Sequence, residues 1–277
     1  METNQSISHA SKPSLASLPI DVAIVTTARP KEYIHQLLSC LRSDLRLRIV
    51  VGGTDVAYLE RYRLGPCVDI VAPPEEEWAR FSGCPVHHRA TWNYWRGLAL
   101  GPSSKERKGL LIFEDDVIVA RGWETRLHDT VRELEVTNQG GFVLALYTAY
   151  PFTPAQGHFY APYPAKRFFG TQAMYYPEAI RRGFSEYLRA NGVDRHVLPY
   201  DLLLRAYVQS HGISLYATVP SLAQHVGEIS TGLGGPSQGG HFSGGAVEAG
   251  NAARMTIPEQ VFKQRGISRD GQQEQHV

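Results

Sequence analysis

Short apolar runs alternate with stretches of helical spacing along the first half of the chain. Val, Ile and Leu dominate the runs, which end in polar residues or glycine and therefore predict buried strands. The predicted strands span residues 21–29, 45–53, 67–73, 109–117 and 141–150. Between them, apolar residues recur every three or four positions, which indicates helices. The predicted helices span residues 30–43, 87–101 and 121–135, with a short helix or turn over 55–65.

Strands that alternate with helices are typical of an α/β fold. Such a chain builds a mixed, mostly parallel sheet with helices on both faces. In these sheets, ligands bind outside the carboxyl ends of the strands. We therefore expect functional residues directly after the predicted strands.

The second half of the chain has a more mixed pattern. Residues 168–177 predict a strand or hairpin arm, residues 177–192 and 199–212 predict helices, and residues 213–227 predict a strand that leads into a loop. Residues 227–251 are dense in glycine and poor in apolar side chains, so they cannot form a core. This composition predicts a flexible loop or tail.

The 277 residues are enough for one large α/β domain. Residues 1–20 are polar and rich in serine, without the apolar segment of a signal peptide, and are predicted to be a disordered leader. We assign residues 21–232 to a single domain and residues 233–277 to a glycine-rich loop and C-terminal tail.

Composition and charge narrow the class of protein. Lys and Arg number 28 against 27 Asp and Glu, and this balance gives no electrostatic reason to expect nucleic acid or an anionic membrane as a partner. Cys40, Cys67 and Cys84 are widely separated, which argues against a disulfide framework or a zinc site. No apolar run approaches the ~20 residues that span a bilayer. We expect a cytoplasmic protein.

The segment LLIFEDDVIV, residues 110–119, places three consecutive carboxylates at the carboxyl end of a predicted buried strand. One interpretation is a solvated turn in which an aspartate caps the following helix. The other is a site for a hard divalent cation such as Mn²⁺ or Mg²⁺, which offsets the repulsion and bridges to the phosphates of a nucleotide.

Two segments resemble a known family. FEDDV, residues 113–117, resembles the DxD-type metal motif of glycosyltransferases with the GT-A fold. PSLAQHVGEIST, residues 220–231, resembles the P-S-L-x-Q-H-V-G segment of the N-acetylglucosaminyltransferase IV group and its bacterial relatives. The resemblance covers about residues 20–232. It implies a Rossmann-like GT-A sheet and metal-dependent transfer of a hexose or N-acetylhexosamine from a nucleotide-diphospho-sugar, with UDP as the expected nucleotide.

The resemblance also implies a metal centre. Asp116, the last carboxylate of the motif, would bind Mn²⁺ or Mg²⁺, while Glu114 or Asp115 would contact the ribose or the metal. His225 lies where a downstream histidine completes the coordination in this family. Imidazole is an acceptable ligand for Mn²⁺. The alternative for His225 is a histidine held by core hydrogen bonds.

A general base is needed if the sugar is transferred with inversion, as the resemblance implies. Asp201 in LPYDLLLRAYV matches the acidic residue before a helix that serves as base in many inverting GT-A enzymes, and Glu228 is the second candidate. The alternative for Asp201 is a purely structural helix cap.

The nucleotide is expected over the carboxyl end of the first strand. Arg89 and Asn93 are four residues apart, so both project from one face of the predicted helix. The resemblance implies a donor contact here, since many GT-A enzymes place an Arg and an Asn on the equivalent helix; the alternative is a solvated helix face. The predicted donor contacts are Thr26, Thr27, Ala28, Arg29, Arg89, Asn93, Glu114 and Asp115, with Ser230 and Thr231 on the diphosphate.

The resemblance also implies that the acceptor side includes GTQAMYYP, because in GT-A folds the segment before the last helices lines the sugar and acceptor pocket. There Gly170 would allow a close approach, and Thr171 and Gln172 would hydrogen-bond sugar hydroxyls. The acceptor itself is not identified by the sequence. The glycine-rich segment 227–251 is either a plain flexible chain or a lid that excludes water from the donor.

Two other functions are open. A nucleotidyltransferase or phosphoesterase on a similar sheet would need a glycine-rich phosphate loop near the N-terminus, and TTARPKE, residues 26–32, has no glycine. A non-catalytic nucleotide- or glycan-binding module of the same fold would keep the metal site without turnover.

Overall fold

The computed structural model describes residues 20–227, except residues 30, 63, 102, 103, 105, 107, 140, 196 and 197. The predicted leader, apart from its last residue, and the predicted tail lie outside the described residues. Glu228, Ser230 and Thr231 lie outside them too. Of the helices that are described, none is long and apolar enough to cross a bilayer.

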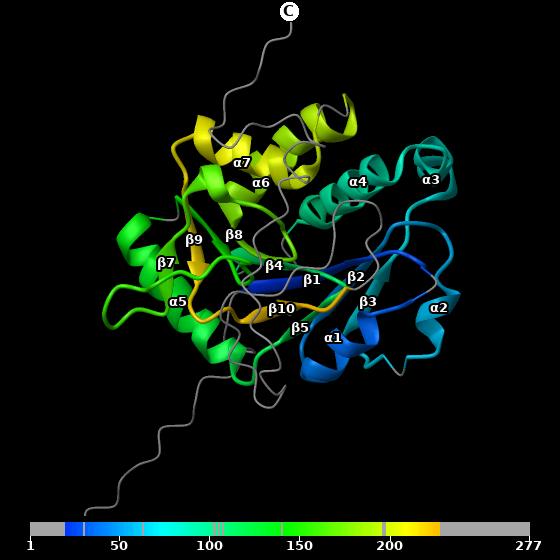
Figure 1. Cartoon of the computed structure of the whole chain (residues 1–277). Helices are drawn as coiled ribbons and strands as arrows, with labels where there is room; N and C mark the ends of the chain where they lie inside the picture. Colours follow the sequence, from blue (N-terminus) through cyan, green and yellow to red (C-terminus); the bar gives the residue numbers. More distant parts are fainter. Residues whose placement is uncertain are drawn as a thin grey trace, which may run out of the picture.

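An eight-stranded mixed sheet forms the centre of the described chain, and the predicted α/β class is confirmed (Figure 1). Its strands are β1 (Ile20–Thr26), β2 (Leu47–Val51), β3 (Val68–Val71), β4 (Gly109–Glu114), β6 (Phe142–Ala145), β7 (Tyr160–Pro162), β8 (Ala173–Pro177) and β9 (Ser214–Thr218). The spatial order is β3-β2-β1-β4-β8-β6-β9-β7.

Most strands run in one direction. β3, β2, β1 and β4 pair in parallel, whereas β8 is antiparallel to both β4 and β6. β6 therefore runs with β4, and β9 is parallel to β6, while β7 is reversed at the edge. The register pairs Val25 of β1 with Glu114 of β4, so the two strands end side by side.

Alternation along the strands divides the core between the two faces of the sheet, because successive side chains of a strand point to opposite sides. Val22 and Ile24 of β1 pack into one hydrophobic cluster, whereas Ala23 and Val25 pack into the other. This explains why the first predicted strand is apolar at consecutive positions: both of its faces are covered.

Helices cover both faces (Figure 1). On one side lie α1 (Ile34–Cys40), α2 (Ala57–Glu60) and α5 (Trp123–Asn138), which contribute to the first cluster. On the other lie α4 (Val86–Ala99), α6 (Glu178–Leu188) and α7 (Tyr200–Ser210), with α3 (Glu75–Ser82) packed against α4. A 3₁₀ turn spans Ala165–Arg167 and a π-helical turn spans Arg189–Val193.

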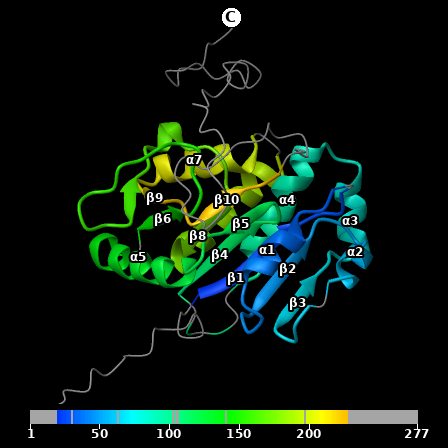
Figure 2. The ribbon, with the colours of Figure 1, turned by 60° about the horizontal axis from the view of Figure 1, so that its bottom comes forward.

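A separate two-stranded ribbon joins distant parts of the chain. β5 (Val117–Val119) pairs antiparallel with β10 (Ala223–His225), which places His225 opposite Val117 (Figure 2). The backbone N–H of Val226 also donates to the carbonyl of Asp116 at 2.8 Å. The ribbon therefore brings the segment after the acidic triplet beside the segment that contains His225.

Several predicted boundaries were wrong. The strand predicted over 141–150 ends at Ala145, because the carbonyl of Leu146 accepts hydrogen bonds from Leu222 and Ala223 in place of a ladder partner. The helix predicted from Pro30 begins at Ile34. α3, β5, β7 and β10 were not predicted as separate elements.

Candidate functional site

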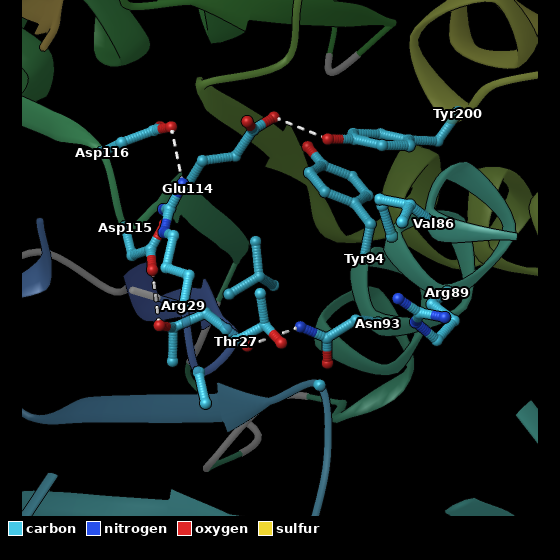
Figure 3. A pocket seen from close by; sticks show the side chains of 15 residues that line it. Thr27, Arg29, Val86, Arg89, Asn93, Tyr94, Glu114, Asp115, Asp116 and Tyr200 are labelled. Carbon is cyan, nitrogen blue, oxygen red and sulfur yellow. Dashed lines mark hydrogen bonds and ion pairs between the residues drawn. The ribbon is translucent and has the colours of Figure 1, made fainter. Parts of the chain in front are cut away.

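A pocket of about 250 Å³ opens where β1 and β4 end, against the first half of α4 (Figure 3). This is the edge of the sheet at which ligands bind in α/β folds. Its lining residues are Val25, Thr26, Thr27, Ala28, Arg29, Gly52, Val86, Arg89, Ala90, Asn93, Tyr94, Glu114, Asp115, Asp116 and Tyr200.

Asp115 is held by the turn that follows β1. The hydroxyl of Thr26 donates to Asp115 Oδ2 at 2.6 Å, and Arg29 Nη2 forms an ion pair with Asp115 Oδ1. These side chains lie close together because β1 and β4 are neighbours in the sheet and end side by side. Asp115 is only 5% exposed; the largely enclosed guanidinium of Arg29 balances its charge, and the Thr26 hydroxyl adds a hydrogen bond.

Asp116 lies between Arg29 and His225. Its Oδ2 is 3.4 Å from Arg29 Nη1 and 3.3 Å from His225 Nε2, and its Oδ1 is buried without a hydrogen-bond partner among the described residues. Burial alone would raise the pKa of Asp116. The hydrogen bond and charge of His225, together with Arg29, outweigh burial and hold this pKa below its ordinary value.

Glu114 has a different environment from its two neighbours. The hydroxyls of Thr171 and Tyr200 both donate to Glu114 Oε1 at 3.0 Å. Desolvation, followed by the charge of Asp116, raises the pKa of Glu114 to about 7, although His225 and the two hydroxyl donors act in the opposite direction. Figure 3 shows Glu114 extended towards Tyr200, away from Arg29.

The α4 wall is fixed to the sheet through Asn93. Its Nδ2 donates to the carbonyls of Thr26 at 3.0 Å and Val50 at 3.4 Å, so α4 is anchored at the ends of β1 and β2. Arg89 Nη1 donates to the carbonyls of Ser82 at 3.3 Å and Cys84 at 2.6 Å. Arg89 and Asn93 both line the pocket, as expected for one helix face.

The donor-contact residues predicted from the sequence lie together wherever the structure describes them. Thr26 to Arg29, Arg89, Asn93, Glu114 and Asp115 all line the one pocket. A role in nucleotide binding stays a prediction for each of them.

The predicted base and acceptor residues lie elsewhere. Asp201 is buried in the first turn of α7 and does not line the pocket, whereas the adjacent Tyr200 does. Gly170, Thr171 and Gln172 do not line it either, but Thr171 and Gln172 contact Glu114. Thr171 donates to its carboxylate and the carbonyl of Gln172 accepts from its backbone N–H at 2.8 Å. Gly170 has φ +84°, a conformation that favours glycine.

Two structural alternatives raised by the sequence were wrong. The acidic triplet is not a solvated helix cap, because Asp115 and Asp116 are 5% and 9% exposed and the chain continues into β5. Asp201 is not the cap of α7 either, because Pro199 occupies that position and Asp201 follows inside the helix.

The residues at the triplet fit a divalent ion in part. In the described part of the chain, no three His, Cys, Asp or Glu side chains are arranged to hold an ion as they stand. Asp116 Oδ2 and His225 Nε2 are 3.3 Å apart, which is close to the ~3 Å between adjacent ligands of an octahedral ion with bonds of about 2.1 Å. Such ions commonly keep only one or two protein ligands and take the others from water and phosphates.

Gly227 completes this corner of the site. A Cβ atom at Gly227 would lie 2.6 Å from Asp116 Oδ2 and 2.8 Å from His225 Nε2, closer than real Cβ atoms come. Only a glycine therefore lets the chain pass over the pair without moving it. Asp116 and His225 thus supply two atoms that fit an ion whose other ligands come from outside this pair.

Sequence reasoning missed Tyr94, Val86, Gly52, Gly227 and Tyr200. Tyr200 directly precedes the predicted base Asp201, and Tyr94 directly follows Asn93, but helical spacing alone did not indicate which neighbour faces the pocket. The two rings stack on each other with centroids 4.6 Å apart. This long-range contact has no signal in the local sequence.

Comparison with known proteins assigns no family to the chain. No protein-family model matches it, and a search of the curated proteins finds no match.

Proposed function

We propose that the protein is a metal-dependent glycosyltransferase that moves a sugar from a nucleotide-diphospho-sugar, with UDP as the expected nucleotide, to an acceptor hydroxyl. The observation that carries the proposal is the contact between Asp116 and His225 beside the pocket. These residues belong to the two segments that resemble GT-A glycosyltransferases, and they are more than a hundred positions apart in the sequence.

Asp116 and His225 would hold Mn²⁺ or Mg²⁺ through Oδ2 and Nε2. The ion would neutralise the charge that develops on the leaving diphosphate. The lowered pKa of Asp116 supports this role, because an ionised carboxylate is the ligand that hard cations prefer. Asp116 Oδ1, which has no hydrogen-bond partner within residues 20–227 as described, offers a second oxygen at the same position.

The pocket wall would bind the nucleoside. Backbone groups of Thr27 and Ala28 lie at the end of β1, and Asn93 keeps this turn in place by donating to the carbonyl of Thr26. Arg89 donates to the carbonyls of Ser82, the last residue of α3, and of Cys84, and it adds a positive charge to the opposite wall. The volume and the mixture of apolar and polar side chains suit a base and ribose.

The acceptor proton requires a carboxylate near the acceptor hydroxyl. Asp201 at the start of α7 and Glu228 beyond the described residues both stay candidates for this base. Gly170, Thr171 and Gln172 stay the predicted acceptor-side segment, and their contact with Glu114 supports a position next to the donor pocket.

Incubation with a panel of UDP- and GDP-sugars and Mn²⁺, with released nucleotide as the readout, tests the activity. We expect release from at least one UDP-sugar and a loss of roughly a hundredfold or more in Asp116→Ala. Asp129→Ala is the matched control, since it removes an exposed carboxylate from α5 and should retain full release. Nucleotide binding without release from any sugar would contradict the enzyme and favour a binding module.

A further inference from the structure

Arg29 occupies the acidic corner that the proposed ion would share. Its Nη2 pairs with Asp115 Oδ1, and its Nη1 is 3.4 Å from Asp116 Oδ2 (Figure 3). The same oxygen of Asp116 faces His225. The side chain is only 10% exposed, and its guanidinium lies over the ring of Tyr33 at 5.0 Å from the centroid. Arg29 is thus a buried cation on two adjacent carboxylates.

The electrostatics of this corner require such a cation. Two neighbouring buried carboxylates repel each other strongly where water does not screen them, and an unpaired buried charge destabilises a fold. With Arg29 in place the pair is largely neutralised. A divalent ion at Asp116 would then lie close to a fixed positive charge and gain little from Asp115.

We propose that Arg29 is an internal counter-cation, which stabilises Asp115 and Asp116 while no metal is bound and weakens the binding of a metal ion by itself. When a diphosphate enters, Arg29 transfers to the phosphate oxygens and frees the carboxylates for the ion. Nucleotide and metal therefore bind cooperatively. The nucleotide part rests on the proposed function, whereas the competition between Arg29 and metal rests on the geometry alone.

Arg29 is equipped for this transfer. It lines the pocket, and its Nε is buried without a hydrogen-bond partner among the described residues, so a donor is available for a new acceptor. A guanidinium pairs with phosphate oxygens through two parallel N–H bonds as readily as with a carboxylate. By thermodynamic linkage, a nucleotide that removes Arg29 raises the affinity for the metal by the same factor as the metal raises that for the nucleotide.

The first experiment measures Mn²⁺ affinity without nucleotide, by calorimetry or by the electron paramagnetic resonance of free Mn²⁺. Arg29→Met removes the charge and keeps the length of the side chain. We expect this variant to bind Mn²⁺ at least about tenfold more tightly than the wild-type protein, because a repelling charge within a few ångström of the ion is lost. Unchanged or weaker Mn²⁺ binding in Arg29→Met would overturn the proposal.

Two control variants isolate the effect. Arg61→Met removes another arginine that pairs with a carboxylate, that of Glu32, outside the pocket, and should leave Mn²⁺ affinity near the wild-type value. Arg29→Lys keeps the charge and should also stay near the wild-type value. If Arg29→Met does not fold, Arg29→Gln takes its place, and a larger rise in Tm on adding Mn²⁺ than the wild-type protein shows is the expected result.

The second experiment repeats the Mn²⁺ titration in the presence of saturating UDP. The wild-type protein should gain Mn²⁺ affinity from UDP, and Arg29→Met should gain much less. Tighter Mn²⁺ binding in Arg29→Met, with no UDP binding to any form, would support the counter-cation and overturn the glycosyltransferase. Normal Mn²⁺-dependent UDP binding with no effect of Arg29→Met on Mn²⁺ alone would overturn only the counter-cation.

Discussion

The three carboxylates of the EDD triplet have three different roles in the fold, although they are consecutive in the sequence. Asp115 is neutralised by Arg29 and Thr26, Asp116 faces His225, and Glu114 accepts two hydroxyl hydrogen bonds. Their repulsion is therefore offset mainly by neighbouring side chains before any ion is considered. Asp116 combines a lowered pKa with an oxygen that has no hydrogen-bond partner in the described part of the chain, which is why we propose it, rather than the other two, as the metal ligand.

Tyr200 provides a test of the environment of Glu114. The pKa of Glu114, about 7, is raised above its unfolded value of 4.5. Between these two pH values the folded state binds more protons than the unfolded state, so the stability falls as the pH rises from 4.5 to above 7. The hydroxyl of Tyr200 reduces this loss by donating to the ionised carboxylate. Tyr200→Phe should lower the free energy of unfolding by about 0.5–1.5 kcal/mol near pH 5 and by about 1.5–3 kcal/mol near pH 8.5.

Urea unfolding at the two pH values, in the presence of a chelator, measures this difference. Tyr94→Phe is the matched control, because its hydroxyl pairs with that of Tyr176 at 2.9 Å and bonds no carboxylate. Tyr94→Phe should lower the free energy of unfolding by the same amount at both pH values. An equal cost of Tyr200→Phe at both pH values would mean that Glu114 does not ionise against Tyr200.

At the scale of elements, the hydrophobic pattern predicted strands that are marked by their own sequence and missed strands that form only by pairing with distant segments. β1 and β4 were predicted because long apolar runs mark strands covered on both faces. β5 and β10 each contain three residues, and their pairing is set by contacts across more than a hundred positions. α3 begins with three glutamates, so its apolar face is too small for periodicity to reveal. The ribbon that positions His225 was thus beyond prediction from pattern.

A substitution at Gly227 tests whether this ribbon positions Asp116 and His225 as the proposed metal ligands. Gly227→Ala would place a Cβ atom against Asp116 and His225 and force them apart. We expect Mn²⁺ affinity, measured by calorimetry with UDP present, to fall on the order of tenfold, a typical effect of disturbing groups that orient a ligand. Gly83→Ala is the control, because no atom lies within 4 Å of the added methyl group. Unchanged Mn²⁺ affinity in Gly227→Ala would remove Asp116 and His225 from the metal centre.

At the scale of the whole molecule, the parallel arrangement of β1 and β4 explains how much of the site could be predicted. Both strands end at the same edge, so residues placed after either one had to meet there. This rule led to Thr26 to Arg29 and the triplet, whereas Arg89 and Asn93 were selected from the resemblance and from their helical spacing; all of them line the pocket. Helical spacing did not indicate which residue at the start of α7 lines the pocket, because the rotation of α7 about its axis depends on packing of its apolar residues against β8 and α6, and that packing turns Tyr200 to the pocket. The role of Asp201 as the base stays a prediction.

Calorimetric titration of UDP into the protein, with Mn²⁺ or with a chelator, tests the central claim that the EDD triplet and His225 form a metal site for a nucleotide diphosphate. We predict UDP binding in the presence of Mn²⁺. With a chelator, or in Asp116→Asn with Mn²⁺, the affinity should fall by roughly a hundredfold or more, because a direct ligand matters at least as much as the groups that orient it. Equal UDP affinity with Mn²⁺ and with chelator, or no UDP binding in either, would contradict the account.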